Sequence, residues 1–256
     1  MNIIDTHSHL YSDDYKDDLS DVVARAVNIG VTKTLLPNID EKSIESLKSC
    51  VNAYPDFFLP MMGLHPTSVG KDFTKQLELI NNELKSDIYI AVGEIGIDLY
   101  WDKLLQDEQT EAFEEQLRWS IELDLPVSIH FRDAAKEVVK SIKRVGESKL
   151  RGVFHSFGGT KGELEQIMEL KNFMIGVNGV ITFKNSGLAE TLKECPTEMV
   201  VLETDSPYLS PMPFRGKRNE SAYLLYILKR LSEVWQINEE TVAEITTNNA
   251  KHMFAC

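Results

Sequence analysis

The sequence predicts an α/β barrel of the (β/α)8 or TIM type, in which eight parallel strands alternate with helices. Short β-branched or apolar runs alternate with longer amphipathic stretches, which is typical of βα units. Eight such runs occur in 256 residues, close to the ~250 that one such barrel commonly uses. We therefore expect residues 1–256 to form a single domain. The main alternative is an open doubly wound sheet, which more often has about five or six strands.

The elements follow from the alternation of these patterns. The predicted strands are residues 3–10, 33–39, 57–65, 89–98, 126–132, 151–157, 173–181 and 199–205. Between them lie amphipathic stretches such as residues 15–29, 41–53, 106–123, 133–145, 160–170 and 186–193. Residues 220–235 follow the last strand, and residues 238–254 read as an extra C-terminal helical segment.

Composition indicates an ordinary globular protein with a sizeable core. Apolar residues make up 43% of the chain, and no apolar run approaches the roughly 20 residues that span a bilayer. Asp5, His7 and His9 interrupt the early apolar stretch, so we expect no signal peptide, no membrane partner and a cytoplasmic location. The three cysteines are widely spaced and match no disulfide or metal framework, which predicts reduced thiols.

The net charge of −13 argues against a protein that coats long duplexes, because such proteins usually present a basic face. An acidic surface repels a polyanion at long range. If a nucleic acid is the substrate, attraction must be local, and we expect brief contact with strand ends or single strands.

Histidines and carboxylates fall at the carboxyl ends of the predicted strands, the face where α/β barrels hold their active sites. The first strand ends Asp5-Thr6-His7-Ser8-His9, and alternation along a strand places His7 and His9 on the same side. Two imidazoles at this spacing can hold one divalent ion, and Asp5 could orient them. The pair alone is equally compatible with two structural histidines.

Four further strands contribute the same kind of chemistry at the same level of the barrel. Glu94 lies in a run suited to burial, where metal coordination or a buried salt bridge would compensate its charge. The other three residues are His130, His155 and Asp205. His7, His9, Glu94 and Asp205 can serve one ion, and Glu94, His130 and His155 a second, with Glu94 shared. The positive charge of two divalent ions would exceed the negative charge of Glu94, Asp205 and a bridging hydroxide, and the excess would complement a phosphodiester monoanion.

These motifs resemble those of the TatD-type metal-dependent deoxyribonucleases, which belong to the amidohydrolase-like barrels. The resemblance covers residues 3 to 254, and it is carried by several short segments. They are Asp5-Thr6-His7-Ser8-His9-Leu10, Gly63-Leu64-His65-Pro66, Gly93-Glu94-Ile95-Gly96-Ile97-Asp98, Ile129-His130-Phe131-Arg132, His155-Ser156-Phe157, Glu203-Thr204-Asp205-Ser206-Pro207-Tyr208-Leu209 and Pro213-Phe214-Arg215-Gly216-Lys217-Arg218-Asn219-Glu220.

The resemblance implies a nuclease that depends on magnesium or manganese and acts chiefly on DNA, often from the 3′ end. It implies the same six ligands: His7, His9, Glu94, His130, His155 and Asp205. Many related barrels bridge their ions with a carboxylated lysine, but residues 89–98 contain no lysine, which agrees with Glu94 as the bridge. The sequence departs from the family's usual pattern at Ser221 and at residues 252–254, and both positions lie away from the expected ligands.

The expected catalytic residues are Asp205 and Glu94. Asp205 would accept the proton of the attacking water or orient that water, although it could instead cap the helix after the last strand. Glu203 and Asp5 would support the ligands rather than bind an ion.

Substrate contacts are expected from His65, Arg132 and the basic cluster of Arg215, Lys217 and Arg218. His65 would touch substrate or water, and Arg132 would hold a phosphate unless it forms an ion pair with Asp98 or Asp133. The basic cluster is either a phosphate-binding lip or a solvated loop. Tyr100 and Trp101 could stack a base, although packing over the barrel rim is the commoner outcome.

We therefore predict a hydrolase that cleaves phosphodiester bonds of DNA with two divalent metal ions, acting as a 3′–5′ exonuclease on single strands or ends. We expect a monomer. An enzyme of the same architecture acting on a cyclic amide, ester or phosphotriester is the alternative, and a non-catalytic metal-binding scaffold is a third. The choice among Mg, Mn and Zn, between DNA and RNA, and between exonuclease and endonuclease stays open.

Overall fold

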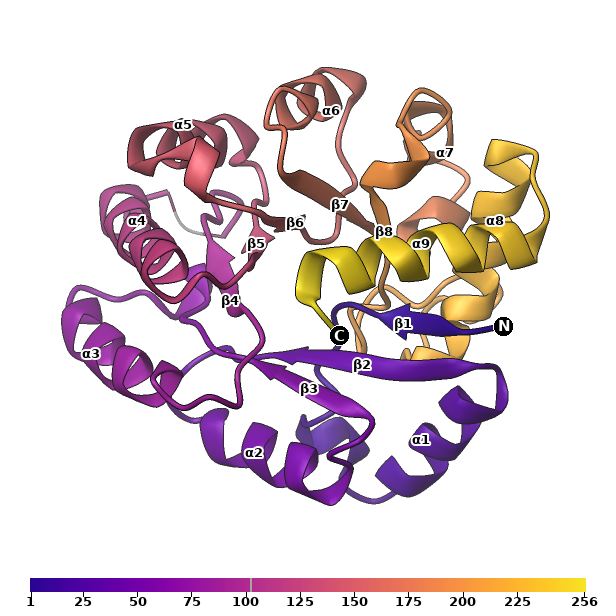
Figure 1. Ribbon diagram of the computed structural model, residues 1–256, viewed down its shortest axis with the longest axis horizontal. Coiled ribbons are helices and arrows are strands. Elements are labelled where there is room, and N and C mark those ends of the chain that lie inside the picture. The colour runs from indigo at the N-terminus through magenta and orange to yellow at the C-terminus, as the bar shows by residue number, and fades with distance from the viewer. Residues whose placement is uncertain (102) are drawn as a thin grey trace.

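In the part of the chain that the structure describes, eight parallel strands follow one another around a barrel (Figure 1). The structure is a computed structural model and describes residues 1–101 and 103–256. The strands are β1 (Ile3–Asp5), β2 (Val31–Pro37), β3 (Phe58–Met61), β4 (Val92–Gly96), β5 (Val127–His130), β6 (Gly152–Phe154), β7 (Phe173–Val177) and β8 (Val200–Leu202). The TIM-barrel prediction is confirmed.

The barrel is built from two hydrogen-bonded sheets, β1-β2-β3 and β4-β5-β6-β7-β8, that meet along two seams. Isolated parallel bridges between Met62 and Val92 and between Ser8 and Ser206 close these seams. Every predicted run overlaps an observed strand, but each strand ends before its run does. The last residues of each run leave the regular ladder and form loops at the carboxyl ends of the strands. These loops and the ends of β4 and β5 carry the candidate site.

Helices surround the barrel on its outside (Figure 1). The helices of the described residues are α1 (Leu19–Asn28), α2 (Ile44–Ala53), α3 (Phe73–Leu84), α4 (Gln106–Leu123), α5 (Ala135–Val145), α6 (Lys161–Met168), α7 (Leu188–Thr191) and α8 (Leu224–Trp235), with α9 (Glu239–Phe254) at one end of the barrel. Short 3-10 helices occur at Asp13–Tyr15, Pro66–Ser68, Glu147–Lys149, Gly179–Thr182, Thr197–Met199 and Ser221–Tyr223. None of the helices in the described residues is long and apolar enough to cross a membrane.

Helix α3 is the element that the sequence analysis did not single out. Its buried residues are Phe73, Leu77, Ile80 and Leu84, which repeat at helical spacing and pack into the main core. The apolar period was therefore present in the sequence, although polar residues fill the rest of the helix.

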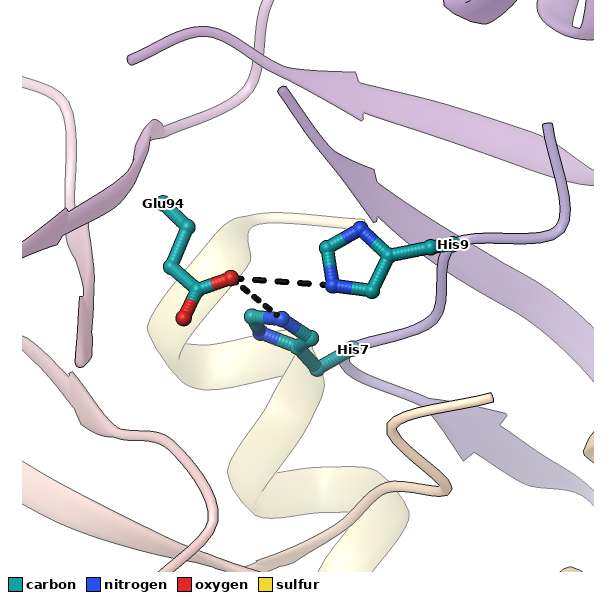
Figure 2. A group of neighbouring side chains, drawn as sticks. All are labelled: His7, His9 and Glu94. Atoms are coloured by element: carbon teal, nitrogen blue, oxygen red, sulfur yellow. Dashed lines mark hydrogen bonds and ion pairs between the residues drawn. The ribbon is translucent and has the colours of Figure 1, made fainter. Parts of the chain in front are cut away.

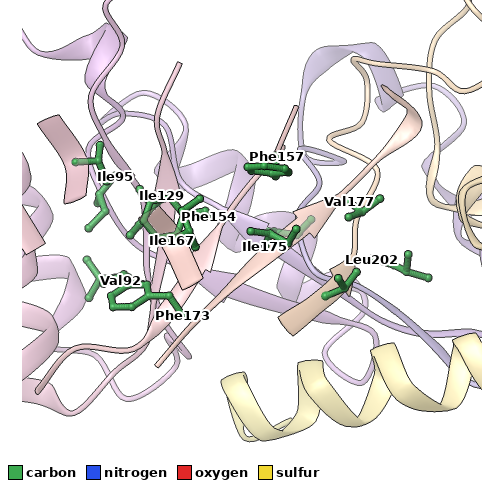
Figure 3. Packing of buried hydrophobic residues seen from close by; sticks show 14 of the residues in the cluster. Val92, Ile95, Ile129, Phe154, Phe157, Ile167, Phe173, Ile175, Val177 and Leu202 are labelled. Carbon is green, nitrogen blue, oxygen red and sulfur yellow. The ribbon is translucent and has the colours of Figure 1, made fainter. Parts of the chain in front are cut away.

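The larger apolar core lies between the strands and the outer helices. Val92, Ile129 and Phe154 extend from neighbouring strands into it, and Ile167 of α6 packs against them (Figure 3). A smaller core fills the barrel interior with the alternate residues of the strands, because successive strand side chains face opposite ways. Its strand members are Ile4, Leu35, Met61, Val153 and Val201.

Helix α9 closes the amino-terminal end of the barrel rather than continuing the outer ring (Figure 1). Its residues Ala250, Met253 and Phe254 pack into the barrel interior. Asn249 fixes the helix by donating from Nδ2 to the carbonyl oxygen of Val200 at 2.8 Å. This plug leaves the carboxyl end of the strands as the end where a substrate can enter.

The plug predicts a large stability cost for Phe254→Ala. The side chain is 3% exposed, and its loss would leave a cavity in the barrel that the surrounding strands cannot fill. We expect the free energy of unfolding to fall by about 3–5 kcal/mol in chemical denaturation. Leu79→Ala on α3 is the control, because Leu79 is 41% exposed, and it should cost about 0.5 kcal/mol or less. Equal effects of the two substitutions would contradict a closed barrel end.

Candidate metal centre

Glu94 is the centre of the candidate site. It lies on β4, its side chain is 2% exposed, and five histidine rings surround its carboxylate. The Oε2 atom lies 3.1 Å from His7 Nε2 and 3.6 Å from His9 Nε2, as Figure 2 shows. The Oε1 atom lies 3.0 Å from His130 Nδ1, 3.2 Å from His65 Nε2 and 3.3 Å from His155 Nε2. One carboxylate is thus shared between two groups of imidazoles.

This environment keeps Glu94 ionised. Burial by itself raises the pKa of a carboxyl group, but the surrounding histidines outweigh that effect and hold the pKa of Glu94 well below its usual range. The cost of burying the carboxylate is thereby offset by nitrogens from segments far apart in the sequence.

His7 and His9 follow β1, and their rings point to the same carboxylate oxygen as the sequence spacing predicts (Figure 2). The local backbone is held by hydrogen bonds to the β8 side, including His9 N to the Ser206 carbonyl at 2.7 Å. Both rings are buried, and burial lowers the pKa of His9 to about 4 and that of His7 well below its usual value. Both imidazoles are therefore neutral at pH 7, as metal ligands must be.

The outer nitrogens of these two rings have partners that sequence analysis missed. His7 Nδ1 lies 3.1 Å from Ser128 Oγ, and His9 Nδ1 lies 3.0 Å from Tyr11 OH. The Tyr11 hydroxyl donates its only proton to the Pro37 carbonyl at 2.6 Å, so its oxygen accepts from His9 Nδ1–H. That bond leaves the Nε2 lone pair of His9 directed at the cleft. Tyr11 follows His7 and His9 at the same spacing of two residues, and this spacing could have identified Tyr11 as a partner of His9.

His155 and Glu203 form a second charged pair beneath Glu94. His155 Nδ1 lies 3.2 Å from Glu203 Oε1, and Nε2 faces Glu94. Burial opposes a charged ring here, but the charges of Glu94 and Glu203 raise the pKa of His155 to about 10. Glu203 is fully buried, and its Oε2 has no hydrogen-bond partner among the described residues. A side chain at Gly176 would collide with this carboxylate, so glycine provides the space for it.

His130 lies between two carboxylates. Its Nδ1 faces Glu94 Oε1, and its Nε2 lies 2.7 Å from Asp98 Oδ2. Although burial disfavours the charged ring, these two acceptors raise the pKa of His130. Asp98 had no assigned role in the site on sequence grounds, where it was considered only as a possible partner of Arg132.

His65 lies within the cluster, with Nε2 3.2 Å from Glu94 Oε1 and 3.3 Å from His130 Nδ1. Its Nδ1 accepts a hydrogen bond from Thr67 N at 3.1 Å, because a backbone amide can only donate. Burial lowers the pKa of His65, so the neutral ring carries its proton on Nε2 and donates toward Glu94. This geometry favours His65 as a donor to Glu94 or to a bound oxygen rather than as a ligand.

Asp205 follows β8 with a left-handed backbone (φ 57°), and its amide donates to the His7 carbonyl at 2.9 Å. The carboxylate Oδ1 lies 3.7 Å from His9 Nε2. Burial, with the charges of Glu94 and Glu203, raises the pKa of Asp205 to about 7 despite the opposing charge of His155. A group with this pKa can take up or release a proton near neutral pH.

Asp5 is buried but does not touch the imidazoles. Its Oδ2 accepts hydrogen bonds from Ser221 Oγ at 2.6 Å and Thr204 Oγ1 at 2.7 Å, and Oδ1 accepts from Thr204 N at 2.9 Å. Asp5 therefore supports the site indirectly, by joining the end of β1 to the segment after β8. These strand ends carry His7 and Asp205.

The donor set fits a divalent cation. Three groups of side chains each bring their ligand atoms within 4.8 Å of one another: His7, His9 and Glu94; His7, His155 and Glu203; and His65, Glu94 and His130. Mixed imidazole and carboxylate donors suit Zn²⁺ or Mn²⁺. The unpartnered oxygen of the buried Glu203 is a group that an added positive charge could compensate. A bound cation would also take the place of the proton that His155 carries between Glu94 and Glu203.

The cluster forms the floor of a cleft of about 800 Å³. The lining includes His9, His65, Glu94, Asp98, Trp101, His130, Arg132, Asp133, His155, Asp205 and Tyr208. Among the described lining residues, Arg132 is the single lysine or arginine. No acidic side chain among the described residues forms an ion pair with it, and its guanidinium carbon lies 3.7 Å from the centre of the Tyr100 ring.

The basic cluster after β8 does not line this cleft in the described residues. Arg218 pairs with Asp18 through two hydrogen bonds of 2.8 and 2.6 Å and packs against Tyr15. Arg215 lies over the Phe183 ring and Lys217 over Phe214. The sequence places these charges near a strand end, and Asp18 neutralises Arg218. A role of this cluster in binding phosphate stays a prediction.

Known proteins resemble this chain over nearly its full length. An uncharacterized metal-dependent hydrolase of Bacillus subtilis is 35% identical over 253 residues, covering 98% of each chain. A protein of Pectobacterium carotovorum named 3′-5′ ssDNA/RNA exonuclease TatD is 29% identical and covers 98% of this chain and 99% of its own. The crystal structure of the TatD homolog YjjV from Escherichia coli K12 superposes with a TM-score of 0.92 at 28% identity, covering 99% of this chain and 98% of that one.

The family comparison gives the same result. The model of the family described as TatD related DNase matches residues 4–255. That span contains the whole histidine and carboxylate cluster around Glu94. The chain belongs to the TatD-related DNase family of metal-dependent hydrolases.

Proposed function

We propose that the chain is a metal-dependent phosphodiesterase that shortens single-stranded DNA from its 3′ end, with RNA as a second substrate. The observation that carries the proposal is Glu94, one buried carboxylate whose two oxygens face different groups of histidines at 3.0–3.6 Å. A bridging carboxylate of this kind is what a two-ion hydrolase needs. The name of the Pectobacterium relative supports the substrate class.

In this proposal His7, His9, Glu94 and Asp205 would hold one divalent ion, and Glu94, His130 and His155 would hold the second. When bound, such ions lower the pKa of water and stabilise negative charge on the departing oxygen. The sites would take Mg, Mn or Zn. Every group comes from one chain, which is compatible with a monomer.

The protein's own residues then position the substrate and move protons. Asp205, ionised when a metal ion is bound, accepts the proton of the attacking water. Arg132 has donors free of any carboxylate partner among the described residues and holds a phosphate oxygen. His65 donates from Nε2 and keeps the Glu94 carboxylate oriented. Glu203 orients His155 from below.

The direct test is cleavage of a 5′-labelled single-stranded oligonucleotide with Mg²⁺ or Mn²⁺. We expect products shortened from the 3′ end, no reaction with EDTA, and a kcat for Asp205→Asn that is lower by roughly 10²–10⁴-fold. Asp133→Asn is the matched control, because it removes another carboxylate of the same cleft that forms no ion pair with the histidines in the described part of the chain. Inert DNA together with turnover of a cyclic amide, ester or phosphotriester would replace this proposal with the amidohydrolase alternative.

The charged His155 predicts that metal binding releases protons. At pH 7 the metal-free protein carries a proton on His155, whose pKa is about 10, and a fractional proton on Asp205, whose pKa is about 7. A ligand must lose its proton, so calorimetric titration with Mn²⁺ should release roughly one proton or more per protein. Apparent affinity should rise with pH across pH 6–8. Binding heats that are independent of the buffer's ionisation enthalpy would contradict this assignment.

The hydrogen bond from His9 to Tyr11 predicts that Tyr11→Phe weakens the affinity for Mn²⁺. The substitution removes the oxygen that accepts from His9 Nδ1–H, so the ring loses its fixed tautomer and orientation. We expect affinity to fall roughly tenfold or more in calorimetric titration. Tyr208→Phe is the matched control, since the Tyr208 ring lies 6.4 Å from the His9 ring and is 59% exposed. Similar losses in both variants would remove the specific role of Tyr11.

A further inference from the structure

Two neighbouring aromatic side chains, Tyr100 and Trp101, are exposed, and Trp101 lines the cleft. Tyr100 is 53% exposed and Trp101 is 70% exposed, and their rings lie 5.0 Å apart at 89°. Packing over the barrel rim is the usual outcome for aromatic residues at this position, and these two do not show it. Large aromatic surface left in water beside a cleft indicates a surface that binds something flat and apolar.

The aromatic pair is fixed to the metal cluster by one carboxylate. Asp98 Oδ1 accepts hydrogen bonds from Tyr100 N at 3.0 Å and Trp101 N at 3.1 Å. The other oxygen of Asp98 holds His130 Nε2 at 2.7 Å. Because Asp98 is 1% exposed and bonded on both oxygens, the backbone that carries the aromatic residues has a defined position relative to Glu94.

Arg132 joins this group from the neighbouring strand end. Its guanidinium carbon lies 3.7 Å from the Tyr100 ring centre and 5.5 Å from the Trp101 ring centre. Asp98 and Asp133 line the same cleft, yet the described residues form no ion pair with Arg132. The planar cation therefore stacks on an aromatic face while its N–H groups remain available to a phosphate.

We propose that Tyr100, Trp101 and Arg132 form a binding site for one nucleotide of a single strand, next to the phosphodiester that reacts at Glu94. The base stacks on Trp101 and the phosphate binds Arg132. This inference rests on the proposed function and deepens it by assigning what selects the substrate. A paired base has both faces covered by its neighbours in the duplex, whereas an unpaired base at a strand end can stack on a protein ring.

The same arrangement explains how a chain of net charge −13 can hold a nucleic acid. Stacking on an aromatic ring requires no counter-charge, and it tolerates any base because every base has a flat face. Arg132 is the one lysine or arginine that lines the described cleft, so few phosphates can be neutralised by side chains of this kind.

Tryptophan fluorescence tests this site directly. Trp101 is the exposed tryptophan, since Trp119 is 4% exposed and Trp235 is partly buried and donates from Nε1 to the Leu192 carbonyl. The probe is a short oligothymidylate added to the Asp205→Asn protein with Mg²⁺, so that the strand is held without being cleaved. We expect quenching that Trp101→Leu abolishes. The affinity should depend weakly on salt, with a log–log slope of about −0.7 for a single phosphate contact.

An abasic oligonucleotide separates stacking from phosphate binding, because it keeps the phosphates and lacks the bases. In otherwise wild-type protein, we expect Trp101→Ala to lower kcat/KM on oligothymidylate roughly tenfold, mainly through KM. The same variant should have little effect on the abasic strand. Met212→Ala is the control, since Met212 is 47% exposed and outside the described cleft lining, and it should change neither substrate.

The outcomes distinguish this inference from the proposed function. The stacking site is overturned if the wild-type protein cleaves abasic and ordinary single strands with the same kcat/KM, or if Trp101→Ala lowers kcat/KM equally on both. In either case the proposed nuclease activity remains. If no phosphodiester is cleaved, the function fails, and unquenched fluorescence with oligothymidylate would then overturn the binding site as well.

Discussion

A carboxylate buried at the end of β4 sets the arrangement of the site. Glu94 has lost its water, and that loss must be offset by donors or cations nearby. The nitrogens that surround it come from segments after β1, after β3, at the end of β5 and after β6. Because these segments are far apart in the sequence, the carboxylate is stabilised only when the barrel is closed. Folding and assembly of the site are therefore one event.

The seam between β1 and β8 joins two of the segments that carry site residues. A bridge from Ser8 to Ser206 and the hydrogen bond from Asp205 N to the His7 carbonyl join the two strand ends directly. The buried carboxylate of Asp5 adds three hydrogen bonds across the same junction. At the opposite end, α9 fills the barrel with apolar side chains. The polar end is thus free to hold charged groups, because the apolar end supplies the stability.

The barrel and the Glu94 cluster could be predicted from the sequence because each depends on a local pattern. Apolar runs mark strands, and polar residues at the ends of parallel strands meet on one face. Helix α3 was overlooked because polar residues obscure its apolar period. Ser128 and Asp98 could not be assigned, since their partners are brought to them by the tertiary fold. The charges of Arg215, Lys217 and Arg218 suggested a phosphate site, but sequence cannot show that Asp18 neutralises Arg218.

The acidic character of the chain then becomes part of the proposed selectivity. A duplex brings two rows of phosphates toward the protein surface. The net charge of −13 repels these phosphates, and the repulsion acts within a Debye length of about 10 Å at 0.1 M salt. A single-strand end brings few phosphates and can place one of them beside Arg132 and the metal ions that the proposed function assigns to the Glu94 cluster. Its unpaired base gains contact with Trp101, a gain that does not depend on charge. Repulsion at long range and stacking at short range therefore both favour a single-strand end over a duplex. A uniformly basic surface would attract both kinds of DNA and would not discriminate between them.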